Sequence, residues 1–252
     1  MRTIIVLIFI SLSLNTADCW AQSKSVAAAV SFLNTEDVKS YSINDLMLSN
    51  FLNRRFELGI NVKPADIKSK LLGSENEYRL IRPLIYRSAG QDAIDEVYDL
   101  TILELSSPAN NWTRALYSGY DIDGFTNSVI TIASEKNGGY AKALFALDLA
   151  VETGNITSEK ATSIAEDIHQ KNTPSEMTYE ETARILYSSF ANEISTNSAI
   201  SKVDVIETQQ NPNGSWSGQS VTSSTLYALW ALLEKDSKQS NKQDNQQKWI
   251  LN

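Results

Sequence analysis

Two carboxylates placed two residues apart are the closest approach to a catalytic pair in this sequence. Asp121 and Asp123 flank Ile122 and come directly before Gly124. Carboxylates at this spacing can share a proton, because neighbouring like charges raise the pKa of one of them, or they can bind Ca²⁺. Asp and Gly are also common in ordinary turns. Asp121 and Asp123 are therefore candidate catalytic residues, with a structural turn as the alternative.

Aromatic residues lie close to these carboxylates in the sequence. Trp112, Tyr120 and Tyr140 surround Asp121. Rings near carboxylates are suited to a concave surface that binds a sugar or a lipid. The alternative is that the same rings pack between helices. We carry Trp112, Tyr120 and Tyr140 forward as candidate ligand-binding residues.

The composition excludes several classes of site. The chain has 252 residues, with one His, one Cys and a net charge of −8. A Cys-rich zinc site, a disulfide framework and a Cys–His dyad are excluded unless a partner chain contributes residues. The negative charge argues against nucleic acid as a partner, because such proteins neutralise phosphates with basic residues. We therefore expect no metal, no other cofactor and no nucleic-acid ligand.

The N-terminus has the pattern of an export signal. Arg2 precedes an apolar run over 4–14 that only Ser11 and Ser13 interrupt. This run is too short to span a bilayer, and small residues at 19 and 21 fit a cleavage site after Ala21. The alternatives are a buried N-terminal helix or a lipoprotein signal that uses Cys19. We predict a signal peptide over 1–21, a secreted or periplasmic location, and no membrane-spanning segment after it.

Helical patterns dominate the rest of the chain. Capping boxes, in which a Ser or Thr and a Glu three residues later each satisfy a free backbone amide, stand at Ser74–Glu77 and Thr178–Glu181. No apolar residue occurs between 235 and 248. We predict one all-α domain over 22–234 and a disordered polar tail over 235–252. The expected helices include 25–33, 42–56, 64–72, 126–133, 140–152, 158–169, 178–194, 197–209 and 220–234.

A sequence pattern occurs twice. Asn-Gly-Ser-Trp at 213–216 precedes Ala-Leu-Trp-Ala-Leu at 228–232, and Asn-Gly-Gly-Tyr at 137–140 precedes Ala-Leu-Phe-Ala-Leu at 143–147. Each copy consists of a glycine turn, an aromatic residue and then a helix that contains the motif Ala-Leu-aromatic-Ala-Leu. The two helical blocks begin 85 residues apart. This spacing indicates a repeat of helix pairs.

The later copy, with the Gln residues before it, resembles the Gln-and-Trp repeat of the terpene cyclase and protein prenyltransferase superfamily. The resemblance covers about thirty residues up to Leu233. It implies an α/α toroid, or a partial superhelix, of about five helix hairpins. It also implies structural roles for Gln210, Gly214, Trp216 and Trp230, with Gln209 or Gln210 capping a helix end beside Trp216.

The family's chemistry fits less well than its repeat. The zinc site of the prenyltransferases cannot be built with only His169 and Cys19, and the Asp-x-Asp-Asp acid of the cyclases lacks its last Asp at Gly124. We therefore expect a non-catalytic, exported binding or scaffold protein for a polysaccharide, lipid or protein ligand. The alternative is a polysaccharide-active lyase, with Arg79, Arg82 and Arg87 as candidate charges, or a divergent cyclase-like enzyme.

Overall fold

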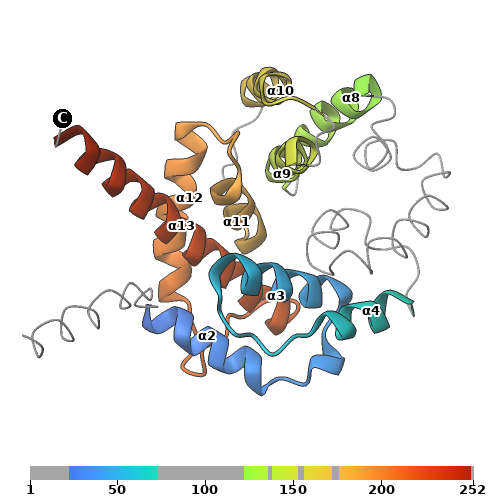
Figure 1. Ribbon diagram of the computed structural model, residues 1–252, viewed down its shortest axis with the longest axis vertical. Helices are drawn as coiled ribbons and strands as arrows, with labels where there is room; N and C mark the ends of the chain where they lie inside the picture. Colours follow the sequence, from blue (N-terminus) through green and yellow to red (C-terminus); the bar gives the residue numbers. More distant parts are fainter. Residues whose placement is uncertain (1–22, 73–121, 136–137, 153–155, 172–175, 251–252) are drawn as a thin grey trace, which may run out of the picture.

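The computed structural model describes residues 23–72, 122–135, 138–152, 156–171 and 176–250 (Figure 1). Within these ranges the chain is helical and contains no strand, which confirms the all-α class. The α-helices are α2 (Lys24–Thr35), α3 (Ile43–Phe56), α4 (Pro64–Leu72), α8 (Ile122–Ala133), α9 (Gly139–Glu152), α10 (Ser158–Lys171), α11 (Tyr179–Tyr187), α12 (Glu193–Thr208) and α13 (Val221–Ile250). A short 3₁₀-helix, η1 (Val38–Ser40), joins α2 to α3.

Two helix starts follow the local signals in the sequence. The Ser42 hydroxyl accepts from the Asp45 backbone N–H, and the Asp45 carboxylate accepts from the Ser42 N–H, so α3 begins with a capping box. Thr178 and Glu181 form the same reciprocal pair at the start of α11. At the end of α3, Glu57 adopts a left-handed backbone conformation. The helix therefore ends at Phe56, where the helix predicted over 42–56 also ends.

Two helix ends differ from the sequence-based expectation. The helix predicted over 178–194 ends early, at Tyr187 (α11), and the helix predicted over 197–209 begins early, at Glu193 (α12). The break is stabilised from outside the segment, since the Asp148 carboxylate accepts from the backbone N–H of Ser189. Asn192 then caps α12 by accepting from the Ser195 N–H.

The polar segment that we expected to be disordered from 235 onward continues α13 as far as Ile250. Lys235 pairs with Asp204 of α12, and Lys238 donates to the Ser188 carbonyl. Lys and Gln, which are frequent here, are also good helix formers. The terminal part of α13 extends away from the other helices (Figure 1).

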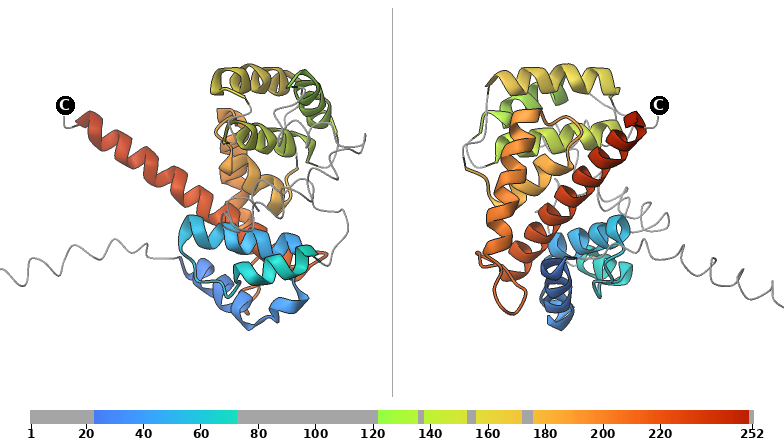
Figure 2. Two further views of the ribbon diagram at one scale, coloured as in Figure 1. Left: turned by 45° about the vertical axis from the view of Figure 1, so that its right-hand side comes forward. Right: turned by 90° about the vertical axis from the view of Figure 1, so that its left-hand side faces the viewer.

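The helices differ in how much of their surface is buried. In α3, α9, α11 and α13, long runs of consecutive residues are buried, whereas α2, α10 and α12 bury a single stripe. In Figures 1 and 2, α2, α3 and α4 lie at one end of the molecule and α8, α9 and α10 at the other, with α11 and α12 between them. The last helix, α13, packs against α11, α12, α3 and α2.

A cluster of four rings joins the buried helices. It contains one ring from each of α3, α9, α11 and α13: Phe51, Phe145, Tyr187 and Trp230. The ring centroids lie between 5.4 and 5.9 Å apart in five of the pairs, all with edge-to-face geometry. This is the arrangement that aromatic quadrupoles favour.

The later copy of the repeated pattern is a turn packed against α2. Gly214 has a φ of +91°, and a Cβ built on it would lie 2.2 Å from the carbonyl oxygen of Ala28. The Gln210 side chain donates to the carbonyls of Ser25 and Gly214, at 2.8 and 3.0 Å. Gln210 and Gly214 therefore fix the turn to the first helix of the described chain.

Trp216, which follows this turn, is a buried anchor between two helices. Its side chain is fully buried, and its Nε1–H donates to the Ile206 carbonyl of α12 at 2.7 Å. Its backbone N–H donates to the Thr225 hydroxyl of α13 at 3.0 Å. Trp216 thus connects the end of α12 to the beginning of α13.

Tyr41 is a second buried anchor, at the junction of η1 and α3. It is 1% exposed, and its hydroxyl donates to the Leu33 carbonyl of α2 at 2.9 Å. Burial raises the pKa of Tyr41 to about 12, with smaller contributions from the negative charges of Glu36 and Asp45.

None of the helices within the described ranges is long and apolar enough to cross a membrane. The predicted signal peptide, 1–21, lies outside the described residues.

Trp216→Ala should lower the free energy of unfolding by about 3–5 kcal/mol, because it leaves a cavity where α12, α13 and the turn meet. Urea denaturation followed by circular dichroism measures this loss. Trp216→Phe, which retains most of the ring, should cost less than the alanine variant. Equal stability of Trp216→Ala and the wild type would contradict the anchoring role.

Tyr41→Phe should change the alkaline limit of stability. The folded protein holds the Tyr41 proton more tightly than the unfolded chain, in which tyrosine titrates near 10. The stability linked to this proton is complete below pH 10 and is lost as the pH rises towards 12. Tyr41→Phe should be about 1 kcal/mol less stable at pH 8, through its lost hydrogen bond. It should lose less stability than the wild type between pH 9 and 11.5, in urea titrations at each pH. Parallel pH dependence of the two proteins would contradict this assignment.

Candidate functional site

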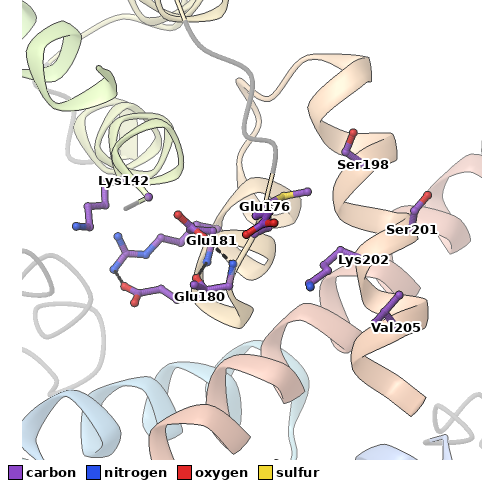
Figure 3. Close-up of a pocket in the computed structure, with 12 residues that line it drawn as sticks. Lys142, Glu176, Glu180, Glu181, Ser198, Ser201, Lys202 and Val205 are labelled. Atoms are coloured by element: carbon purple, nitrogen blue, oxygen red, sulfur yellow. Dashed lines mark hydrogen bonds and ion pairs between the residues drawn. The ribbon is translucent and has the colours of Figure 1, made fainter. Parts of the chain in front are cut away.

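A cavity of about 990 Å³ lies between α9, α11 and α12 (Figure 3). Helix α9 contributes Lys142, and α12 contributes Ser198, Ser201, Lys202 and Val205. The start of α11 and the residues before it contribute Glu176, Met177, Thr178, Glu180, Glu181 and Arg184. The lining is therefore mostly charged and hydroxyl-bearing.

Glu181 is held in place at the edge of this cavity. One of its carboxylate oxygens, Oε2, accepts from the Thr178 backbone N–H at 2.6 Å, as part of the capping box of α11. Gly138, with a φ of +86°, lies so close to Glu181 that a Cβ on it would stand 2.7 Å from Oε1. The turn before α9 and the N-terminus of α11 are therefore closely fitted around this carboxylate.

Arg184 forms a buried cationic wall of the cavity. The residue is 5% exposed, pairs with Glu180 one helical turn earlier, and places its guanidinium carbon 5.1 Å from the centroid of the Phe145 ring. Its Nε atom is buried and has no hydrogen-bond partner among the residues that the structure describes. A buried donor without a partner is costly, so this N–H is available to an acceptor.

The hydroxyl of Tyr227 lies beside the same ion pair. Burial raises the pKa of Tyr227 to about 12, and the charge of Glu180 adds to the effect. The charge of Arg184 and its hydrogen bond with Tyr227 act in the opposite direction. Tyr227 therefore stays protonated at neutral pH.

Lys142 and Lys202 differ from Arg184 because the side chain of neither forms a hydrogen bond or ion pair with any residue that the structure describes. Both side chains are half-buried. In Figure 3 they stand on either side of Glu180 and Glu181, Lys142 on α9 and Lys202 on α12. The cavity thus contains two ammonium groups that can pair with a ligand.

Tyr140, a predicted ligand-binding residue, lies in the contacts between helices. It is 5% exposed, and its hydroxyl lies 2.9 Å from Nδ1 of His169 and 3.1 Å from Oγ of Ser195. The His169 Nε2 is in turn 3.0 Å from the Phe190 carbonyl. Burial raises the pKa of Tyr140, and the hydrogen bond with Ser195 lowers it by less. Tyr140 therefore links α9 to α10 and α12, as in the packing alternative.

Of the other residues predicted to be catalytic, ligand-binding or charged site residues, Asp123 alone lies within the described ranges. Trp112, Tyr120 and Asp121 lie outside the described residues, as do Arg79, Arg82 and Arg87. Asp123 falls in the first turn of α8, so the Asp-Gly pair at 123–124 is helical and forms no separate turn. The catalytic role of Asp121 and Asp123 remains a prediction.

Lys142, Arg184 and Lys202 were not among the residues predicted from the sequence. The capping box at Thr178 and the spacing of Glu180 and Arg184, four residues apart, were signals for the local geometry of α11. No local signal brings α9 and α12 to the two sides of that helix. Within the described ranges, no group of three or more His, Cys, Asp or Glu residues is arranged to hold a metal ion.

Comparisons with known proteins do not assign the chain to a family. No family model matches it, no curated protein matches it, and no solved structure matches it. The resemblance to the terpene cyclase and prenyltransferase repeat therefore rests on the residues around Trp216 alone.

Tyr140→Phe should lower the free energy of unfolding by about 1–3 kcal/mol, because it removes a hydroxyl that has two partners inside the protein. Tyr179→Phe is a matched control, because the Tyr179 hydroxyl donates only to the exposed Gln209 side chain at 3.2 Å. Urea denaturation of both variants tests the difference. If the two variants lost equal stability, the Tyr140 network would have no special structural role.

Proposed function

We propose that this chain is a non-catalytic binding protein that holds a polar ligand in the cavity between α9, α11 and α12. The observation that carries the proposal is the cavity itself, about 990 Å³ in volume. Its lining includes the ammonium groups of Lys142 and Lys202, which pair with no other residue in the part of the chain that the structure describes. Ligand sites in proteins are typically cavities of a few hundred to about 1,000 Å³ with a few well-placed polar groups.

The chemistry of the lining supports binding rather than catalysis. A serine nucleophile needs an adjacent base. The Ser201 hydroxyl donates to the Asn197 carbonyl, and the only histidine of the chain, His169, bonds to Tyr140 and Phe190. The cavity lining in the described part of the chain contains no Asp, His or Cys.

The packing of the buried helices also argues against a cyclase-like enzyme. Such an enzyme needs an open apolar cavity in which reactive intermediates are shielded from water. The rings of Phe51, Phe145, Tyr187 and Trp230 instead contact one another between α3, α9, α11 and α13. This close packing favours a structural role for the aromatic side chains.

A polar ligand fits the cavity better than a lipid. Among the described lining residues, the apolar side chains are those of Met177 and Val205. Binding of an acyl chain depends on burying apolar surface against apolar surface, which these two residues cannot provide. Of the ligand classes expected from the sequence, a polysaccharide or a protein segment therefore remains.

Two further parts of the proposal concern location and architecture. The apolar run over 4–14 supports export, with cleavage after Ala21. The packing of α13 against α2 and α3, and the alternation of less buried and more buried helices, support a partial α/α superhelix. N-terminal sequencing of the exported protein should begin at Gln22.

Blocking the cavity tests the proposed function. Purified protein is screened by calorimetry against short peptides, oligosaccharides and phosphatidylcholine vesicles. We expect a peptide or an oligosaccharide to bind the wild type, and Ser201→Trp, which places a large ring in the cavity, to weaken that binding at least about tenfold. Ser163→Trp puts the same ring on an exposed position of α10 and should bind normally.

Three results would contradict the proposal. The first is normal binding by Ser201→Trp, which would locate the ligand elsewhere. The second is a preference for vesicles over every polar ligand. The third is the absence of any peptide or oligosaccharide binding by a wild-type protein that circular dichroism shows to be folded.

A further inference from the structure

The charged groups that line the cavity are not equally available to a ligand. Glu180 is paired with Arg184, and one oxygen of Glu181 accepts from the Thr178 N–H. Lys142, Lys202 and Glu176 have no partner among the described residues. Glu176 is exposed to solvent, whereas both lysines are half-buried. Among the half-buried charges of the described lining that have no ion-pair partner, two are cationic, Lys142 and Lys202, and one is anionic, Glu181, whose carboxylate has only the Thr178 N–H as a partner.

This imbalance indicates an anionic ligand. A partly buried ammonium group without a counterion has lost hydration that no protein group replaces. The buried Nε–H of Arg184 is a third donor that has no partner in the described ranges. Carboxylates satisfy such donors with short, charge-assisted hydrogen bonds. Because Lys142 and Lys202 come from different helices, a ligand that pairs with both carries more than one carboxylate.

The neutral part of the lining distinguishes between two kinds of polyanion. The described lining residues include no Trp, Tyr or Phe, and so offer no ring face on which a sugar could stack. They do offer the Oε1 atom of Glu181 and the hydroxyls of Ser198 and Ser201 as acceptors for peptide N–H groups. Met177 and Val205 provide a small apolar contact for aliphatic side chains. These features suit a peptide better than an acidic saccharide.

We infer that the cavity binds an acidic peptide segment whose carboxylates pair with Lys142 and Lys202, while its backbone hydrogen-bonds to Glu181 and the serines of α12. The inference rests on the proposed function, and it names the ligand class of that same site. The chain has a net charge of −8, so its surface on average repels an acidic peptide. Attraction of such a peptide therefore depends on Lys142 and Lys202, the two cations of the described lining that no carboxylate pairs with.

Fluorescence anisotropy with labelled peptides tests the inference. The probes are a ten-residue peptide that alternates Glu and Ser, the same peptide with Gln in place of Glu, and an oligogalacturonate of equal charge. We expect the full chain to bind the Glu peptide at least about tenfold more tightly than the Gln peptide, because each carboxylate–ammonium pair is partly shielded from water.

Charge reversal locates the site. The double variant Lys142→Glu, Lys202→Glu should bind the Glu peptide at least about tenfold more weakly than the wild type. The matched control, Lys24→Glu, Lys160→Glu, changes the net charge equally at exposed positions outside the cavity and should bind within about threefold of the wild type. Circular dichroism of both double variants verifies that they are folded.

The possible failures separate the inference from the proposed function. Tighter binding of the oligogalacturonate, equal binding of the Glu and Gln peptides, or an equal loss in the two double variants would each overturn the acidic-peptide assignment. If Ser201→Trp abolishes binding of a ligand that the charge reversals leave unaffected, the proposed function stands and this inference fails. If no peptide or oligosaccharide binds the wild type, both fail.

Discussion

The cavity keeps its shape because four helices meet at one cluster of rings. Trp230 is central to it, and its buried indole N–H needs an acceptor, which is the Glu234 carboxylate at 3.0 Å. Glu234 is 1% exposed, and burying its negative charge without a counterion would destabilise the fold. Arg55 of α3 supplies that counterion. The Arg55 guanidinium also lies 5.0 Å from the Tyr187 ring centroid. Packing of the rings thus determines where this ion pair lies, with Glu234 buried and Arg55 reaching it from the surface.

The same constraint places the second ion pair at the cavity. Phe145 contacts Tyr187 and Trp230 on one side and the Arg184 guanidinium on another. Arg184 is buried, and Glu180 compensates most of its charge. Removing one partner of such a pair costs more than replacing both, because an unpaired charge remains. The Arg184 side of the cavity is therefore part of the core, while the side chains of Lys142 and Lys202 have no such partners in the described part of the chain.

The parts of the fold that the sequence predicts well are those with local causes. The predicted capping box at Thr178 starts α11, and Ser42 starts the helix predicted from 42, because each cap needs only residues within four positions of one another. The end of α11 was predicted wrongly because it depends on Asp148, about forty residues away. The length of α13 was also missed, since Lys235 and Lys238 find partners on other elements.

The two copies of the repeated pattern show why the site was harder to predict than the fold. In the later copy Gly214 lies against the Ala28 backbone, and the side chain of Trp216, two residues further on, is fully buried. In the earlier copy Gly138 lies against the Glu181 side chain, so the same kind of turn forms the edge of a cavity. Two similar local sequences therefore have different surroundings: the turn at Gly214 packs against a helix backbone, and the turn at Gly138 lines a cavity. The difference lies in the facing element, which is a backbone on α2 in one case and a carboxylate on α11 in the other.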